Sequence, residues 1–191
     1  MPRTPARRVW AGRARAGGLC ASLLLVLTGC GASEPAPLKA LPPDAPADLC
    51  STVPAATRTG LETASNTDTS GDPTAACSLR SGPNDSPQVR VVITWIQLDD
   101  DGSADSVLAS QCRSIDTATY RLQSGYSAQG ADKACAGSGT IDGADAASIA
   151  AVAGRAVLTV RLSSKPAGTQ PSLARGTQML EGVIASLAAG S

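Results

Sequence analysis

The chain contains no histidine and no phenylalanine, and its 191 residues include only two tryptophans and two tyrosines. Histidine is the side chain whose ordinary pKa best suits general acid–base catalysis near neutral pH, so the commonest catalytic group is missing. The chain also lacks the G-x-S-x-G sequence that places a serine nucleophile at a strand-to-helix turn. We therefore predict that the protein is not an enzyme and has neither catalytic residues nor a cofactor.

Long hydrophobic runs are also missing, and the most apolar stretch covers residues 19–27. That stretch is about half of the roughly 20 residues that a helix needs to cross a bilayer. Five arginines precede it and small residues follow it, which is the pattern of a secretory signal peptide. We expect the protein to be exported.

The apolar stretch ends in Leu27-Thr28-Gly29-Cys30, which resembles the bacterial lipobox. In a lipobox the cysteine receives a lipid, and the signal peptide is cleaved just before it. We expect residues 1–29 to form a lipoprotein signal peptide and the lipid on Cys30 to anchor the protein to the outer face of the cell membrane. The alternative is a plain signal peptide that happens to end in a cysteine.

Positive charge is scarce once the signal peptide is removed. The full chain has 16 basic and 16 acidic residues, and residues 1–29 hold five of the basic ones and none of the acidic ones. The mature chain keeps 11 basic and 16 acidic residues, a formal charge of −5. Proteins that bind nucleic acids cluster lysine and arginine against phosphate charge, so we expect no nucleic-acid partner.

The mature chain divides into a short tether and one domain. Residues 30–47 begin with the lipidated cysteine and contain five prolines without a periodic apolar pattern, which predicts an extended Pro-rich tether. Residues 48–191 have the length of a single domain.

Four cysteines lie in this domain, at Cys50, Cys77, Cys112 and Cys135. An even number of cysteines in an exported domain predicts two disulfides, and without a C-x-x-C pair or a histidine we expect no metal site. Three pairings are possible. We favour Cys50 with Cys77 and Cys112 with Cys135, because Cys112 lies on the apolar stripe of a predicted helix and the loop of residues 120–137 is long enough to fold over it. Crossed pairings remain open.

The regular elements predict the fold class. Residues 88–98, QVRVVITWIQL, are dense in β-branched side chains and predict a central strand. Ser103 caps a helix with apolar residues at helical spacing. Residues 148–152 and 156–163 predict a β-hairpin, and a last helix begins near Pro171. This order predicts an α+β domain in which helices pack on an antiparallel β-sheet.

Several short motifs carry a family resemblance: the lipobox, the Pro-rich spacer, "DLCSTVP", "CSL" before "VRVVITW", "GADKAC" and "AGRAVLTVRL". Together they resemble the small actinobacterial cell-envelope lipoproteins grouped as a family of unknown function. The family commonly has an aromatic residue two positions after the second cysteine, where this chain has Leu79. The resemblance implies an α+β sheet fold similar to extracellular mycobacterial sensor domains and PsbP-like proteins. It supports the pairing of Cys50 with Cys77 and supplies no catalytic positions.

These observations predict a lipid-anchored, non-enzymatic binding module of the cell envelope whose partner is an envelope protein or a small ligand. The alternative is a carrier or sensor of an apolar molecule or lipid, held in a cavity between sheet and helices near Trp95, Val107 and Leu158. Trp95 lies on the more apolar face of the predicted central strand, where an ordinary core position is the simpler interpretation.

Two further features fall in connecting segments. Asp99, Asp101, Ser103 and Asp105 alternate like the ligands of a calcium loop, but the glycine comes fourth rather than sixth and no glutamate closes the loop. We expect a solvated turn whose acids favour the following helix N-terminus, with calcium binding as the alternative. Tyr120 and Tyr126 lie in the loop before Cys135, where aromatic residues are candidates for recognition.

Overall fold

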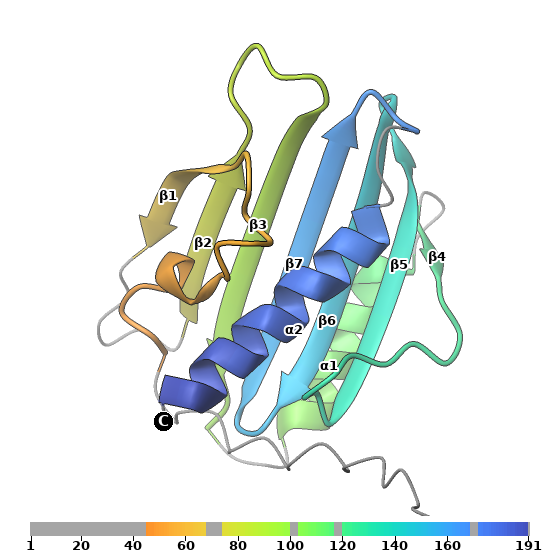
Figure 1. The fold of residues 1–191 in the computed structure, drawn as a ribbon. Coiled ribbons are helices and arrows are strands. Elements are labelled where there is room, and N and C mark those ends of the chain that lie inside the picture. Colours follow the sequence, from red (N-terminus) through yellow and green to blue (C-terminus); the bar gives the residue numbers. More distant parts are fainter. Residues whose placement is uncertain (1–44, 68–73, 100–102, 117–119, 169–171, 191) are drawn as a thin grey trace, which may run out of the picture. The chain divides into compact units, whose positions relative to one another are not determined.

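The computed structural model describes residues 45–67, 74–99, 103–116, 120–168 and 172–190. All of them fall in one compact unit, residues 37–191. Seven strands form one antiparallel sheet in the order β1-β2-β3-β7-β6-β5-β4 (Figure 1). The strands are β1 (Glu62–Thr67), β2 (Thr74–Arg80), β3 (Gln88–Gln97), β4 (Arg121–Leu122), β5 (Lys133–Ile141), β6 (Ala144–Ala153) and β7 (Ala156–Lys165), and the helices are η1 (Cys50–Thr52), α1 (Ser103–Ile115) and α2 (Ser172–Gly190). The predicted α+β class is confirmed.

Helix α2 and the short helix η1 cover one face of the sheet (Figure 1). The apolar residues of α2 recur at helical spacing, so the helix buries one stripe against β5, β6 and β7. Trp95, Leu158 and Leu180 are among the largest fully buried side chains of the resulting core. This cluster is the main hydrophobic core of the domain.

Two glycines let α2 approach its neighbours closely. A Cβ atom on Gly176 would lie 3.1 Å from Cδ1 of Ile149 on the sheet, and one on Gly182 would lie 2.6 Å from Cγ of Pro54. Gly176 therefore faces the sheet, whereas Gly182 faces the segment after η1.

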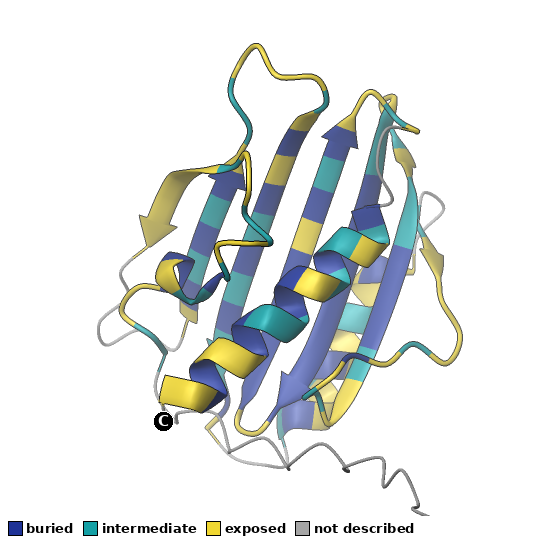
Figure 2. Ribbon diagram, viewed as in Figure 1, coloured by how far each residue is buried: buried dark blue, intermediate teal, exposed yellow. Residues whose placement is uncertain are grey.

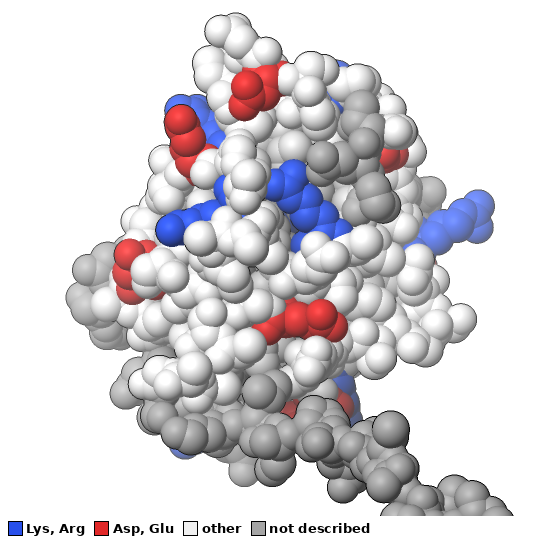
Figure 3. Space-filling model, viewed as in Figure 1, with Lys and Arg blue, Asp and Glu red and all other residues white. Residues whose placement is uncertain are grey.

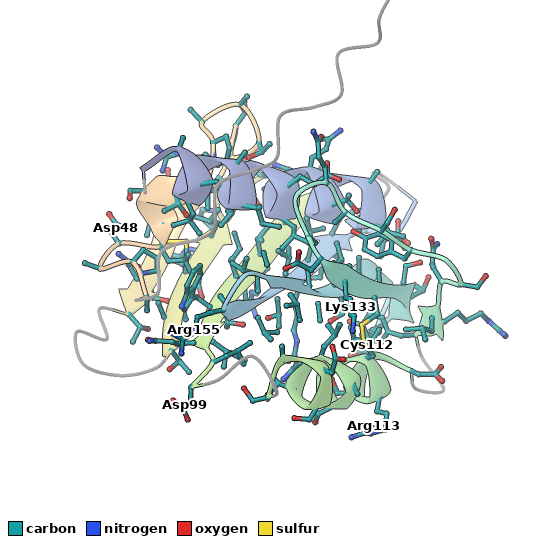
Figure 4. All side chains as sticks on the ribbon, turned by 90° about the horizontal axis from the view of Figure 1, so that it is seen from below. Asp48, Asp99, Cys112, Arg113, Lys133 and Arg155 are labelled. Atoms are coloured by element: carbon teal, nitrogen blue, oxygen red, sulfur yellow. A yellow bond between two sulfur atoms is a disulfide. The ribbon has the colours of Figure 1, made fainter. Side chains whose placement is uncertain are left out.

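Helix α1 packs on the opposite face of the sheet, against β4, β5, β6 and β7 (Figure 4). It buries a smaller cluster that includes Leu108, Ile115, Val152 and Val157. Strand β6 lies between the two helices, and its last eight residues are all buried. In Figure 2 this strand is continuously dark, whereas β2 and β3 are banded by alternating burial.

Strand β5 differs most from the sequence-based expectation, because residues 120–137 were expected to form a loop. β5 passes through Gly137, Ser138 and Gly139, which have low intrinsic preference for strands. A Cβ atom on Gly137 would lie 2.5 Å from Cγ2 of Ile115, so α1 needs glycine at this position. Tertiary packing therefore overrides the local preference of this segment.

Two disulfides tie peripheral elements to the sheet, and their pairing is the one favoured from the sequence. Cys50 of η1 is bonded to Cys77 of β2, and Cys112 of α1 is bonded to Cys135 of β5. Disulfides of this kind indicate an oxidising, extracytoplasmic compartment. None of the helices in the described part of the chain has the length and apolar character needed to span a bilayer.

Candidate functional site

Helix α1 covers only one end of its face of the sheet. Its apolar cluster takes in Ile96 and Leu98 at the end of β3, and Val157 at the start of β7. Seen from below in Figure 4, α1 lies under one part of the sheet, whereas α2 extends across much of the other face. The ends of β2, β3 and β7 away from α1 are where exposed side chains alternate with buried ones.

The exposed positions at these ends carry four basic side chains, Arg80, Arg90, Arg161 and Lys165. We call these four residues the basic face. Arg80 lies directly opposite Arg90 in the β2–β3 ladder, and Arg161 and Lys165 lie opposite Val92 and Gln88 in the β3–β7 ladder. Because side chains alternate along a strand, this register places all four on the sheet face that carries α1.

None of these four side chains forms an ion pair or a hydrogen bond with another described residue. The nearest acid in the register is Glu62, which lies opposite Arg80 on the edge strand β1 and is exposed. Like charges directly opposite each other in a sheet are destabilising, so the Arg80–Arg90 neighbours oppose folding slightly. Residues 30–191 include only 11 basic residues, and four of them gather here.

The opposite face shows a different charge pattern. On the α2 side, seen in Figure 3, basic atoms lie together above the centre, and acidic atoms lie in separate groups around them. The α2 side therefore carries charges of both signs.

A pocket of about 340 Å³ lies at the end of the basic face. It is lined by Arg80, Ser81, Gly82, Pro83, Gln88, Val89, Arg90, Ala144, Ser163 and Lys165. Three of the four residues of the basic face line this pocket, Arg161 does not, and no carboxylate is among the lining residues. The pocket is therefore suited to an anionic group.

Residues 81–83 of the loop that joins β2 to β3 form one wall of this pocket. Several hydrogen bonds hold the loop, among them one from the amide of Ser81 to the carbonyl of Val89 at 2.9 Å. The amide of Gly82 donates to Oδ2 of Asp85 at 2.6 Å, and the amide of Val89 donates to Oγ of Ser81 at 2.9 Å. The side-chain amide of Gln88 donates to the carbonyl of Pro83 at 3.1 Å. These bonds fix the loop against the sheet, so the wall exists without a ligand.

A second depression, of about 370 Å³, lies near the start of α2. Asp145 is the only charged residue in its lining, and apart from Leu173 the other lining residues are polar or small. The Asp145 carboxylate already accepts a hydrogen bond from the amide of Gly168 at 2.5 Å. This depression has no set of matched charges comparable with that of the first pocket.

The three residues predicted for an apolar ligand pocket do not line one cavity. Trp95 and Leu158 are partners in the β3–β7 register and are fully buried in the main core under α2. Val107 packs on the other side of the sheet, in the smaller cluster under α1. The indole Nε1 of Trp95 is buried and has no hydrogen-bond partner among the described residues. Both regions are packed with side chains.

Part of the acidic turn at residues 99–105, for which calcium binding was the alternative interpretation, lies outside the described residues, including Asp101. Both carboxylate oxygens of Asp105 accept hydrogen bonds from Nζ of Lys133, at 2.7 and 2.8 Å. The backbone carbonyl of Asp99 accepts one from Arg155 at 2.7 Å (Figure 4). No group of three metal-ligating side chains occurs in the described ranges. Cys30, the predicted lipidation site, also lies outside them.

The loop after β4 holds Tyr126 against α2. The Tyr126 hydroxyl shares a hydrogen bond with Oγ1 of Thr177 at 2.8 Å, and the amide of Gln129 donates to Oε1 of Glu181 at 2.8 Å. Burial raises the pKa of Tyr126, the hydrogen bond to Thr177 lowers it, and the negative charge of Glu181 raises it, with burial dominating. Tyr126 therefore fastens its loop to the core. Tyr120 is half-buried.

Sequence reasoning missed the basic face, because its members are far apart along the chain. The signal was present in the strands: Arg90 alternates with Val89 and Val91, and Arg161 alternates with Val160 and Leu162. What the sequence did not supply was the register that places β2, β3 and β7 side by side.

Comparison of the chain with protein-family models, with curated proteins and with solved structures finds no match in any of the three. The resemblance to actinobacterial cell-envelope lipoproteins therefore rests on the sequence motifs and stays a prediction. The function has to be argued from the geometry of the site.

Proposed function

We propose that this chain is a lipid-anchored binding protein of the cell envelope that recognises an anionic ligand through its basic face and catalyses no reaction. The observation that carries the proposal is the gathering of Arg80, Arg90, Arg161 and Lys165 on one exposed sheet face, without an acidic partner among the described residues. The lipobox at Cys30 and the two disulfides support the location.

The charge balance favours an anion over the other partners considered. Four exposed cations in an otherwise acidic chain make a local positive potential that attracts negative groups. A bound anion relieves the repulsion between Arg80 and Arg90, which lie directly opposite each other in the β2–β3 ladder. The basic face therefore has a physical reason to be occupied.

The apolar carrier receives less support from the geometry. The space between α2 and the sheet is filled by the main core, to which Trp95 and Leu158 belong. Of the two depressions described above, the one of about 340 Å³ is lined by three cations, and the one of about 370 Å³ is lined mostly by polar or small residues. We therefore favour a ligand that binds by charge over one that binds by apolar burial.

A polyanion tests the binding proposal. The purified full chain should bind soluble dextran sulfate, and fail to bind neutral dextran, in titrations that weaken with added salt. The double variant Arg90→Gln/Arg161→Gln should bind about tenfold more weakly or worse. The matched control Arg113→Gln/Arg121→Gln removes the same charge from exposed positions elsewhere and should bind like the parent. An equal loss in both variants would show that net charge alone matters and would overturn the proposal.

The anchor has its own test. Cys30→Ala should move the exported protein from the membrane fraction into the medium, because the lipid is attached to that sulfur. Signal cleavage with continued membrane attachment of the variant would contradict a lipid on Cys30.

A further inference from the structure

We infer, on the basis of the proposed function, that the pocket at the end of the basic face binds a phosphomonoester, the phosphate of a small polar molecule. Arg80, Arg90 and Lys165 line that pocket, and Arg161 lies outside it on the same face. The inference narrows an anionic ligand to one chemical group and one location.

The number of charges favours phosphate over carboxylate. A phosphomonoester carries a charge of about −1.5 to −2 at neutral pH, whereas a carboxylate carries −1. Three cations line the pocket and no acid does. A dianion balances most of this charge, and a single carboxylate leaves two cations uncompensated.

The arrangement of the two arginines suits a tetrahedral group. Residues directly opposite each other in an antiparallel ladder have Cβ atoms about 4.5–5.5 Å apart, and Arg80 and Arg90 are such a pair. Guanidinium groups bind phosphate oxygens through two parallel N–H donors, so two neighbouring arginines can clamp one phosphate from the same side. Lys165, opposite Gln88 on the neighbouring strand, adds a point charge from a diagonal position.

Hydroxyl groups complete the lining. Ser163 lies directly opposite Arg90 in the β3–β7 ladder. The oxygen of Ser81 accepts the amide of Val89, which leaves the hydroxyl hydrogen of Ser81 to donate to a ligand. Both serines line the pocket. Phosphate oxygens accept hydrogen bonds only, so a lining of donors matches them.

The size of the pocket points to more than an inorganic ion. Its volume of about 340 Å³ is at the lower end of small-molecule sites, which span about 300–1,000 Å³. No aromatic side chain lines it, and the remaining lining is small or polar. We therefore expect the phosphate to be attached to a hydrophilic group the size of a sugar or glycerol.

Calorimetry with the purified full chain tests this inference through three probes of similar size. Glucose 6-phosphate should bind, whereas glucuronate, which carries a carboxylate, should bind at least about tenfold more weakly, and glucose should not bind. Glucuronate binding as tightly as glucose 6-phosphate would overturn the preference for phosphate.

Matched variants test the location. Arg90→Gln and Lys165→Gln should each weaken glucose 6-phosphate binding by about tenfold or more, and Arg161→Gln by less than about twofold, because Arg161 does not line the pocket. Thermal unfolding of each variant checks that it remains folded. An equal loss in all three variants would place the phosphate on the open face and contradict the pocket.

Vesicles identify the source of the phosphomonoester. Phosphatidylcholine vesicles containing phosphatidic acid should displace glucose 6-phosphate if the group is a lipid headgroup, and should fail to do so if the ligand is soluble. Equal displacement by phosphatidylglycerol, a phosphodiester, would overturn the inference. If the parent protein binds dextran sulfate through Arg161 but does not bind glucose 6-phosphate, the phosphate pocket is refuted and the proposed function stands. If the parent protein binds neither probe, the proposed function is refuted as well.

Discussion

Helices cover the two faces of the sheet to different extents. The 19-residue helix α2 and η1 cover one face over a continuous apolar core, whereas the 13-residue helix α1 covers only one end of the other face. Strand β7 carries both patterns: Leu158 and Val160 are buried under α2, and Arg161 and Lys165 are exposed beyond α1. The same strand therefore serves the core on one side and a charged surface on the other.

This difference shows which side chains are needed for packing and which are not. Under α2 every inward side chain contributes to stability, so its chemistry is dictated by packing. Beyond α1 the side chains of β2, β3 and β7 bury little, so their chemistry is free to serve binding. Arg80 and Arg90 lie opposite each other in this region, and their repulsion lowers stability slightly. Packing does not explain the presence of two arginines at these positions.

The largest expected effect comes from two positions on β7. Leu158→Ala deletes a side chain that is fully buried under α2, and we expect a loss of about 2–5 kcal/mol in the free energy of unfolding. Arg161→Ala, three residues further along, should change it by less than about 0.5 kcal/mol. Denaturant unfolding measures both. A comparable loss at Arg161 would mean that the basic face is structural, which would end the contrast between the two faces.

Removal of the disulfide between α1 and β5 should give the next largest loss of stability. Removing it with Cys112→Ala/Cys135→Ala opens a loop of 23 residues, and a loss of about 3 kcal/mol is expected in the chain-entropy account. Because only a small cluster holds α1, its amides should exchange with solvent faster than those of α2.

A nearby contact serves as the control for that double variant. Lys133→Met removes the exposed ion pair between Lys133 and Asp105, whose side chains are 57% and 68% exposed, and should cost less than about 1 kcal/mol. Equal protection of α1 and α2 in the disulfide variant would show that the smaller cluster suffices to hold α1.

The sequence predicted the elements whose apolar residues recur with a clear period. β3, the β6–β7 hairpin and the two long helices follow from such patterns, and the hairpin turn at Gly154 has the positive φ of 56° that favours glycine. β5 was not predicted, because Gly137 and Gly139 are poor strand formers. The glycine at position 137 is explained only by the helix that packs on it.

The basic face could not be predicted from the sequence for a related reason. Arg80 and Arg161 lie 81 positions apart in the chain, and only the pairing of β2, β3 and β7 brings them to one face. Strand order and register depend on long-range contacts that one sequence does not reveal. Local periodicity identified the strands, and tertiary pairing was needed to identify the surface.

The smallest expected effect concerns Tyr126, whose loop joins the edge strand β4 to β5 and contacts α2. Burial raises the pKa of Tyr126 above its usual value of 10.0, so the folded protein favours the neutral phenol. The stability that follows from this preference is present below pH 10 and is lost as the pH rises through the folded-state pKa. Stability should therefore fall more steeply above pH 10 in the parent than in Tyr126→Phe, which has no group to ionise there.

Denaturant unfolding at pH 8 and above pH 10 measures this difference. At pH 8, Tyr126→Phe should be less stable by about 0.5–1.5 kcal/mol, because the hydrogen bond to Thr177 is lost. Above pH 10 that gap should narrow. The phenol absorbance provides an independent reading, since the chain has only two tyrosines and the later titration should vanish in the variant. A stability difference that stays constant across this pH range would mean that solvent reaches the Tyr126 hydroxyl freely and that the loop does not bury this side chain against α2.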